Sequence, residues 1–109
     1  MRAIVQRVKS SSVSVNDKII SEIDYGLNVL VGMSIDDNDK DLKYIGDKII
    51  GLRIFDDKEG TMNLSVKDVK GDILIISQFT LYGDARKGRR PSYINALNPK
   101  EAEKMYDKL

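Results

Sequence analysis

The feature that most constrains the fold of this chain is a pair of short apolar runs, Leu27–Val31 and Ile73–Ile76. Runs of four or five residues are too short for a buried helix but have the length of a strand. The second run is unbroken, which is typical of a strand buried on both faces. The sequence therefore predicts a sheet built on these two segments, with Leu27–Val31 as a central strand.

Weaker patterns predict further strands and turns around this sheet. Residues 3–15 alternate loosely between apolar and polar side chains, which predicts one long strand with a bulge near Ser10–Ser12. Asn16-Asp17 is a turn signal and predicts a hairpin leading into a strand over Ile19–Ile23. Residues 52–60 predict a short strand and a turn that closes at Gly60, and the segment from Ser65 has room for one helical turn.

Two segments have helical periodicity. Between residues 37 and 52 apolar side chains recur at helical spacing, with Asp39 as the predicted N-cap and Gly51 near the end. Asn98, Pro99 and Glu101 have the spacing of an N-cap, a first-turn proline and a capping-box glutamate. The apolar face of this second helix comprises Ala102, Met105, Tyr106 and Leu109. We expect that face to dock on the sheet, because a helix of about 11 residues is marginal alone.

The size and composition of the chain are those of one globular domain. Its 109 residues are 41% hydrophobic and 32% charged, and a chain of this length forms a single domain, here residues 1–109. No run of about 18 apolar residues predicts a transmembrane helix. The first ten residues lack the uninterrupted apolar stretch of a secretory signal. These features predict a cytoplasmic protein.

The chain contains no cysteine and no histidine. This composition excludes disulfides, thiolate nucleophiles, Cys/His zinc sites and a Ser-His-Asp triad. It also removes the side chain best suited to acid–base catalysis near neutral pH. An enzyme with this composition has to use carboxylates, hydroxyls, amides, backbone groups or a group on its substrate.

Polar side chains follow the apolar run Ile73–Ile76 directly. If the strand continues, Ser77, Phe79 and Leu81 lie on one face, and Gln78 and Thr80 lie on the other. Polar groups at the end of a buried strand are a common place for a binding or catalytic site. The alternative is that Thr80 is a strand-favouring residue and Gln78 a solvated edge residue.

A basic segment follows, although the net charge of the chain is only +1. Residues 84–90 carry four cations, Arg86, Lys87, Arg89 and Arg90, against the single carboxylate of Asp84. Arginine suits phosphate oxygens in two-point contacts. The flanking residues Tyr82 and Tyr93 are candidates for stacking on a base. The alternative is a solvated loop whose cations pair with acidic neighbours.

Carboxylates around residues 56–60 form a third candidate site. Asp56, Asp57 and Glu59, together with Asp68 and Asp72, are ligands of the type that a hard cation prefers. They lack the regular spacing of an EF-hand loop. A hairpin turn is the better interpretation of residues 56–60, and no metal or other cofactor is expected.

Several motifs together resemble the D-aminoacyl-tRNA deacylase family. They are MRAIVQRV at the start, LRIF and MNLS in the middle, and SQFTL followed by RKGRRPS. Their order and spacing agree with the family over essentially all 109 residues. The pair SQFTL and KGRRPS is the specific part of this resemblance.

The resemblance implies an enzyme of translation quality control. Such an enzyme hydrolyses the ester that joins a D-amino acid, or glycine mischarged on tRNA(Ala), to the 3′-terminal adenosine of tRNA. The implied fold is α/β, with a largely antiparallel, twisted, barrel-like sheet and helices packed on one side. The family is a homodimer with its site at the subunit interface. Its members are thought to use backbone donors and the substrate's own 2′-hydroxyl, which is compatible with the absence of histidine.

The resemblance also implies roles for individual residues. The pocket for the terminal adenosine and the ester would be lined by Ser77, Gln78, Phe79 and Thr80. Thr80 is regarded as a nucleophile in some accounts of the family and as a positioning residue in others. Arg7 would brace the pocket. The residues near the acceptor-stem phosphates would be Arg86, Lys87, Arg89 and Arg90.

One family motif has no counterpart in the sequence. A Gly-Pro pair with a cis peptide is thought to exclude L-amino acids in the family, but Pro91 and Pro99 follow arginine and asparagine here. We therefore expect the sequence to lack the family's C-terminal segment. Two alternatives to a deacylase are a non-catalytic tRNA-binding module and a related editing domain, such as that of archaeal threonyl-tRNA synthetases. No DNA or membrane partner is expected.

Overall fold

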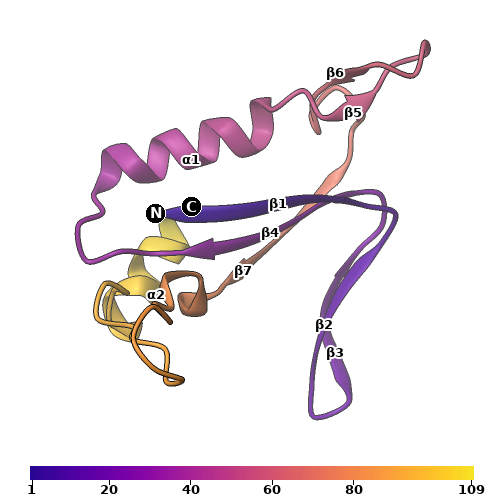
Figure 1. Cartoon of the computed structure of the whole chain (residues 1–109). Coiled ribbons are helices and arrows are strands. Elements are labelled where there is room, and N and C mark those ends of the chain that lie inside the picture. The colour runs from indigo at the N-terminus through magenta and orange to yellow at the C-terminus, as the bar shows by residue number, and fades with distance from the viewer. The chain divides into compact units, whose positions relative to one another are not determined.

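The computed structural model describes all 109 residues, which form two compact units. The first unit comprises residues 1–4, 30–46 and 77–109, and the second comprises residues 5–29 and 47–76. Strands β1 (Arg2–Val8), β4 (Gly26–Gly32) and β7 (Asp72–Ser77) form a sheet in the order β1-β4-β7 (Figure 1). The mixed α/β class with antiparallel pairing is confirmed, whereas closure of the sheet into a barrel stays a prediction.

The core is centred on β4, as predicted for a central strand. Leu27, Val29 and Val31 are completely buried. In β7, by contrast, only Leu74 is buried, and the other three residues of the run Ile73–Ile76 are partly exposed. The expected burial of this run on both faces is therefore wrong. The reason is that β7 lies at the end of the strand order and has a neighbour on one side only.

The hairpin of β2 (Ser11–Val15) and β3 (Lys18–Ile23) confirms the predicted turn. Asn16 and Asp17 have φ angles of 52° and 64°, the left-handed pair that a tight two-residue hairpin needs and that Asn and Asp tolerate. The single long strand expected over residues 3–15 is wrong. It divides at Lys9 and Ser10 into β1 and β2, and the bulge lies between Val13 and Ser14.

The hairpin of β5 (Phe55–Asp56) and β6 (Met62–Leu64) confirms the turn expected to close at Gly60. Asp57 organises this turn, because its Oδ1 accepts hydrogen bonds from the N–H groups of Thr61 (3.1 Å) and Glu59 (2.9 Å). These bonds, that of Thr61 foremost, lower the pKa of Asp57. The carboxylate therefore stabilises its own turn.

The segment from Ser65 forms one hydrogen-bonded turn, as predicted. The N–H of Val69 donates to the carbonyl oxygen of Ser65 at 3.2 Å, and the Asp68 carboxylate accepts from the Ser65 N–H at 3.0 Å. This backbone bond is the main cause that lowers the pKa of Asp68. The geometry brings no three carboxylates close enough together to hold a metal ion.

Both predicted helices form. Helix α1 spans Asp39–Gly51, but its cap is Asn38 and not Asp39. The Asn38 side chain accepts from the N–H of Lys40 at 2.9 Å, and Asp41 accepts from the Asn38 N–H at 3.0 Å. The N-cap must precede the first helical residue, so Asp39 lies one position too late.

Helix α2 spans Pro99–Lys108 and starts as the sequence predicts. The Asn98 side chain accepts a hydrogen bond of 3.0 Å from the Glu101 N–H, and Pro99 is in the first turn. Neither helix is long and apolar enough to cross a membrane.

Candidate active site

The first element of the candidate site is a tight turn that ends β7. The N–H of Gln78 donates to the Val31 carbonyl at 2.8 Å, and residues Phe79–Tyr82 then form a 3₁₀ helix, named here the 79–82 turn. The N–H of Gly83 closes it on the Thr80 carbonyl at 2.9 Å. The strand alternation expected for residues 77–81 is therefore wrong, because the chain leaves the sheet immediately after Ser77.

The turn brings the two polar side chains of SQFTL together. The Gln78 amide nitrogen donates a hydrogen bond to the Thr80 hydroxyl oxygen. Alternation along a strand also placed these two side chains on one side, but here the turn creates the contact. An oxygen that accepts one hydrogen bond becomes a better donor of its own proton. Because Thr80 is exposed, its hydroxyl is available to a bound molecule.

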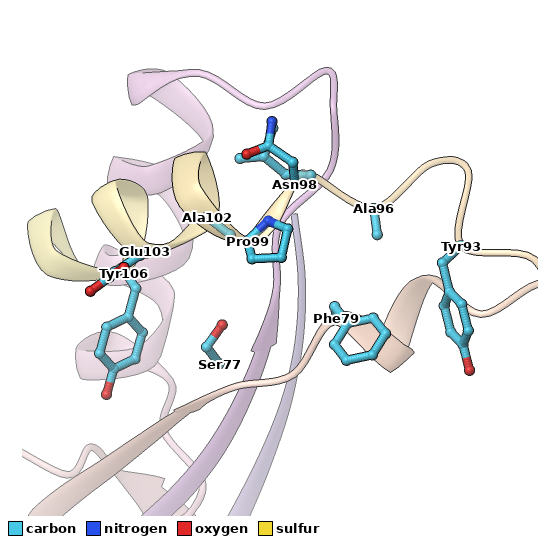
Figure 2. Close-up of a pocket in the computed structure, with 10 residues that line it drawn as sticks. Ser77, Phe79, Tyr93, Ala96, Asn98, Pro99, Ala102, Glu103 and Tyr106 are labelled. Atoms are coloured by element: carbon cyan, nitrogen blue, oxygen red, sulfur yellow. The ribbon is translucent and has the colours of Figure 1, made fainter.

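A pocket of about 490 Å³ lies beside this turn. Figure 2 shows Phe79 and Tyr93 next to each other at one side, with Ser77 and α2 at the other. The two rings meet edge to face, with centroids 5.1 Å apart and planes at 65°. Its lining residues are Ser77, Phe79, Tyr93, Ala96, Leu97, Asn98, Pro99, Ala102, Glu103 and Tyr106. The pocket is mainly apolar and has an aromatic wall of the kind on which a base stacks.

The structure places the four predicted pocket residues in two sets. Ser77 and Phe79 line the pocket, whereas Gln78 and Thr80 form the polar pair of the adjoining turn. The contribution of α2 was missed by reasoning from the sequence. The signal was present, because Ala102 and Tyr106 belong to the apolar face of α2 that was expected to pack on the sheet.

The basic segment forms an exposed loop with a closed base. Asp84 and Ser92 exchange two backbone hydrogen bonds of 2.8 Å. Within this loop, which we call the 84–92 loop, the Asp84 carboxylate holds Arg86 through contacts of 2.7 Å and 2.9 Å. These hydrogen bonds lower the pKa of Asp84 to about 2. The other three cations of this loop are exposed and have no carboxylate partner; they are Lys87, Arg89 and Arg90.

The two tyrosines beside the basic loop differ in their surroundings. Tyr93 contacts Phe79 in the pocket wall and is 39% exposed. Tyr82 is half-buried, with the Arg2 guanidinium carbon 4.5 Å from its ring centroid. Burial, and then the charge of Asp37, raise the pKa of Tyr82. Only Tyr93 therefore suits the stacking role predicted for both residues.

Arg7 belongs to the second unit of the chain. Its Nη1 donates to the Ile54 carbonyl at 3.0 Å and contacts the Asp56 carboxylate at 3.3 Å. These contacts fix the guanidinium against β5 and the residue before it. The predicted role of Arg7 in bracing the pocket stays a prediction.

Comparison with known proteins identifies the family. The family model for D-Tyr-tRNA(Tyr) deacylase matches residues 4–109. Proteins named D-aminoacyl-tRNA deacylase from Clostridium beijerinckii and Fervidobacterium nodosum are 61% and 58% identical over 109 residues. Each of these matches covers all of this chain and 73% of the relative. The deacylase of Clostridium kluyveri is 59% identical with the same coverage.

Solved structures show the same fold. A c-Myc DNA unwinding element binding protein superposes with a TM-score of 0.93 at 40% identity, over 99% of this chain and 72% of its own. A probable eukaryotic D-amino acid tRNA deacylase has a TM-score of 0.77 at 23% identity, over 97% of this chain and 62% of its own, which supports the fold alone. On the family match and the identities above, the chain belongs to the D-Tyr-tRNA(Tyr) deacylase family.

Proposed function

We propose that this protein hydrolyses the ester bond of D-aminoacyl-tRNA and so acts in translation quality control. The observation that carries the proposal is the hydrogen-bonded pair of Gln78 and Thr80 next to an apolar pocket with an aromatic wall. The names of relatives at about 60% identity support the same reaction. The pocket would take the terminal adenosine, with the ester lying toward the turn.

The chemistry would need no side-chain base. Water adds to the ester carbonyl carbon, and the bond to the ribose 3′-oxygen breaks to release the D-amino acid and the free 3′-hydroxyl. Because the Thr80 oxygen already accepts a hydrogen bond from Gln78, the Thr80 hydroxyl is suited to donate one to the developing oxyanion. An amide nitrogen cannot remove a proton, so this pair favours Thr80 as a donor over Thr80 as a nucleophile. The substrate's 2′-hydroxyl remains the candidate for directing the attacking water.

The 84–92 loop would bind the acceptor stem of tRNA. Lys87, Arg89 and Arg90 are exposed and would contact phosphates, whereas Asp84 already holds Arg86. Arg86 therefore contributes less to this contact than the sequence alone suggested. Phosphate contacts release counterions, so binding should weaken steeply with salt.

Several finer features are part of the same proposal. They are residues 1–109 acting as one deacylase domain, a homodimeric assembly, a cytoplasmic location, and action on glycine mischarged on tRNA(Ala). Arg7 would brace the pocket. The family match over residues 4–109 supports the first of these features, and the others rest on the resemblance of the sequence motifs to the family.

The test is release of labelled tyrosine from D-tyrosyl-tRNA by the purified 109-residue chain, beside L-tyrosyl-tRNA and a reaction without protein. Rapid release of the D-form alone would support the proposed reaction with its chirality. Release of both forms would support the chemistry but overturn the selectivity.

No release from either ester, with tRNA still bound, would favour a non-catalytic tRNA-binding module. Release of an L-amino acid from a tRNA mischarged with it, in place of the D-form, would favour the related editing domain. Because the name of one structural relative concerns DNA, a single-stranded DNA competitor is a necessary control for the binding assay.

A further inference from the structure

The 79–82 turn needs support from outside itself. It is four residues long, and the backbone bonds at its two ends run from the Leu81 N–H to the Gln78 carbonyl (3.3 Å) and from the Gly83 N–H to the Thr80 carbonyl (2.9 Å). A 3₁₀ helix of this length has poor hydrogen-bond geometry and leaves terminal carbonyl groups without partners. The orientation of the Thr80 hydroxyl therefore depends on what holds the turn.

Arg2 supplies that support at the end of the turn. Its Nη1 donates to the Leu81 carbonyl oxygen at 2.8 Å, and its guanidinium carbon lies 4.5 Å from the centre of the Tyr82 ring. One planar cation thus contacts both residues that follow Thr80 in the turn. The guanidinium suits this double contact, because it donates in its plane and stacks with its face.

The opposite restraint comes from β4. The Val31 carbonyl accepts from the Gln78 N–H at 2.8 Å, and Gly32 lets the turn approach closely. A Cβ atom at Gly32 would lie 3.0 Å from the Gln78 carbonyl oxygen and 3.0 Å from the Leu81 Cβ. The β4 backbone therefore limits the turn at its start, and the Arg2 side chain fixes its end.

We propose that Arg2 is a positioning residue, which holds the 79–82 turn so that the Thr80 hydroxyl is aimed at the reacting ester. The proposal rests on the proposed deacylase function and deepens it. Arg2 does not touch the substrate. It acts through the Leu81 carbonyl and the Tyr82 ring, and its loss should lower turnover while leaving the affinity for tRNA unchanged.

The test compares Arg2→Met with Arg53→Met in the full chain. Arg53 is the matched control, because it is also exposed and donates to one backbone carbonyl, that of Asn63, at 2.7 Å. Displacement of a catalytic group by about 1 Å can cost roughly 100-fold in rate. We expect Arg2→Met to lower kcat for D-tyrosyl-tRNA by roughly 10- to 100-fold with KM within about two-fold, whereas Arg53→Met leaves both unchanged.

Three further measurements separate positioning from a loss of folding. Arg2→Lys keeps a cation that can donate to the Leu81 carbonyl but loses the planar face that contacts the Tyr82 ring, so it should recover only part of the rate. In a Thr80→Ala background, Arg2→Met should cost little further turnover, because residues that act through one group are not additive. Amide exchange at Gly83, which reports the bond to Thr80, should accelerate in Arg2→Met and not in Arg53→Met.

The outcomes distinguish this inference from the function on which it rests. Absence of turnover in the wild-type chain would overturn the deacylase proposal and, with it, any part for Arg2 in that reaction. Wild-type turnover with an unchanged kcat in Arg2→Met would overturn the role of Arg2 alone. That role would also be overturned if Arg2→Met raised KM only, or if its loss added fully to that of Thr80→Ala.

Discussion

The 79–82 turn and the 84–92 loop are neighbours in the chain but are held in opposite ways. The turn is bonded to the Val31 carbonyl, lies in close approach to Gly32 and contacts Arg2. The loop is closed only at its base, between Asp84 and Ser92, and the cations at its tip are exposed. Figure 2 shows Phe79, which belongs to the turn, next to Tyr93, which directly follows the loop, and their two rings meet in the pocket wall.

The difference follows from what each segment has to do. Hydrogen bonds to a developing oxyanion depend on fixed geometry, and small displacements are costly in rate. Attraction between cations and phosphates falls off slowly with distance, within the limits of screening by salt, and tolerates mobile side chains. Substitutions in the turn should therefore change turnover, and those in the loop should change affinity and its salt dependence.

The largest effect is expected at Thr80. Thr80→Ala removes the hydroxyl that accepts from Gln78, and loss of one oxyanion donor typically costs roughly 100-fold in kcat. Single-turnover hydrolysis of D-tyrosyl-tRNA measures the rate, and filter binding measures the affinity for tRNA. Thr80→Ser is the control, because it keeps the hydroxyl. Equal losses of rate and affinity in Thr80→Ala would contradict the division between turn and loop.

The next effect is expected at Gly32, which fixes how closely β4 approaches the turn. In Gly32→Ala the new methyl group would meet the Gln78 carbonyl oxygen at 3.0 Å. Because that oxygen is backbone, the turn must move, which should cost about 1–3 kcal/mol of unfolding free energy and roughly 10-fold in kcat. Urea unfolding and the hydrolysis assay measure the two effects.

Gly51→Ala is the matched control for this substitution. Nothing lies within 4 Å of a Cβ atom at Gly51, the last residue of α1, and alanine has the higher helix propensity. This variant should keep full activity and equal or slightly greater stability. A similar loss of rate in both variants would mean that the position of the turn is not what limits turnover.

The turn is also where reasoning from the sequence failed, and the reason is physical. Local chemistry is readable, so the cap at Asn98 and the hairpin turn at Asn16 and Asp17 were correctly predicted. The end of β7 depends on a contact distant in the sequence, the hydrogen bond from Gln78 to Val31. The predicted strand alternation continued past this point, so it assigned residues 79–81 to the faces of a strand where the chain forms a 3₁₀ helix. Ser77 and Phe79 line a pocket of the structure, but the helix residues that surround them could not be read from the sequence, and their role toward a substrate stays a prediction.

A smaller effect is expected in the 84–92 loop. Arg89→Ala with Arg90→Ala should weaken tRNA binding roughly five-fold at low salt and reduce the slope of log K against log salt by about two. The rate of hydrolysis at saturating tRNA should not change. Lys58→Ala with Lys67→Ala removes the same charge from the second unit and serves as the control. An unchanged slope in the double arginine variant would exclude this loop from the tRNA contact.

The smallest effect is expected at Asp84, which competes with phosphate for Arg86. Asp84→Asn removes the partner of Arg86 and should strengthen tRNA binding by about two-fold at low salt, with a steeper salt slope.

Since the pKa of Asp84 is about 2 in the folded chain, below the usual value near 3.8, its ion pair stabilises the fold above pH 3.8 and is lost only as the pH falls through about 2. Titration of Asp84 should therefore leave the affinity of the wild-type chain unchanged between pH 7 and pH 5. If wild-type affinity rose as the pH fell from 7 to 5 and that of Asp84→Asn did not, Asp84 would be taking up its proton and releasing Arg86 to phosphate within this range, which would contradict its low pKa.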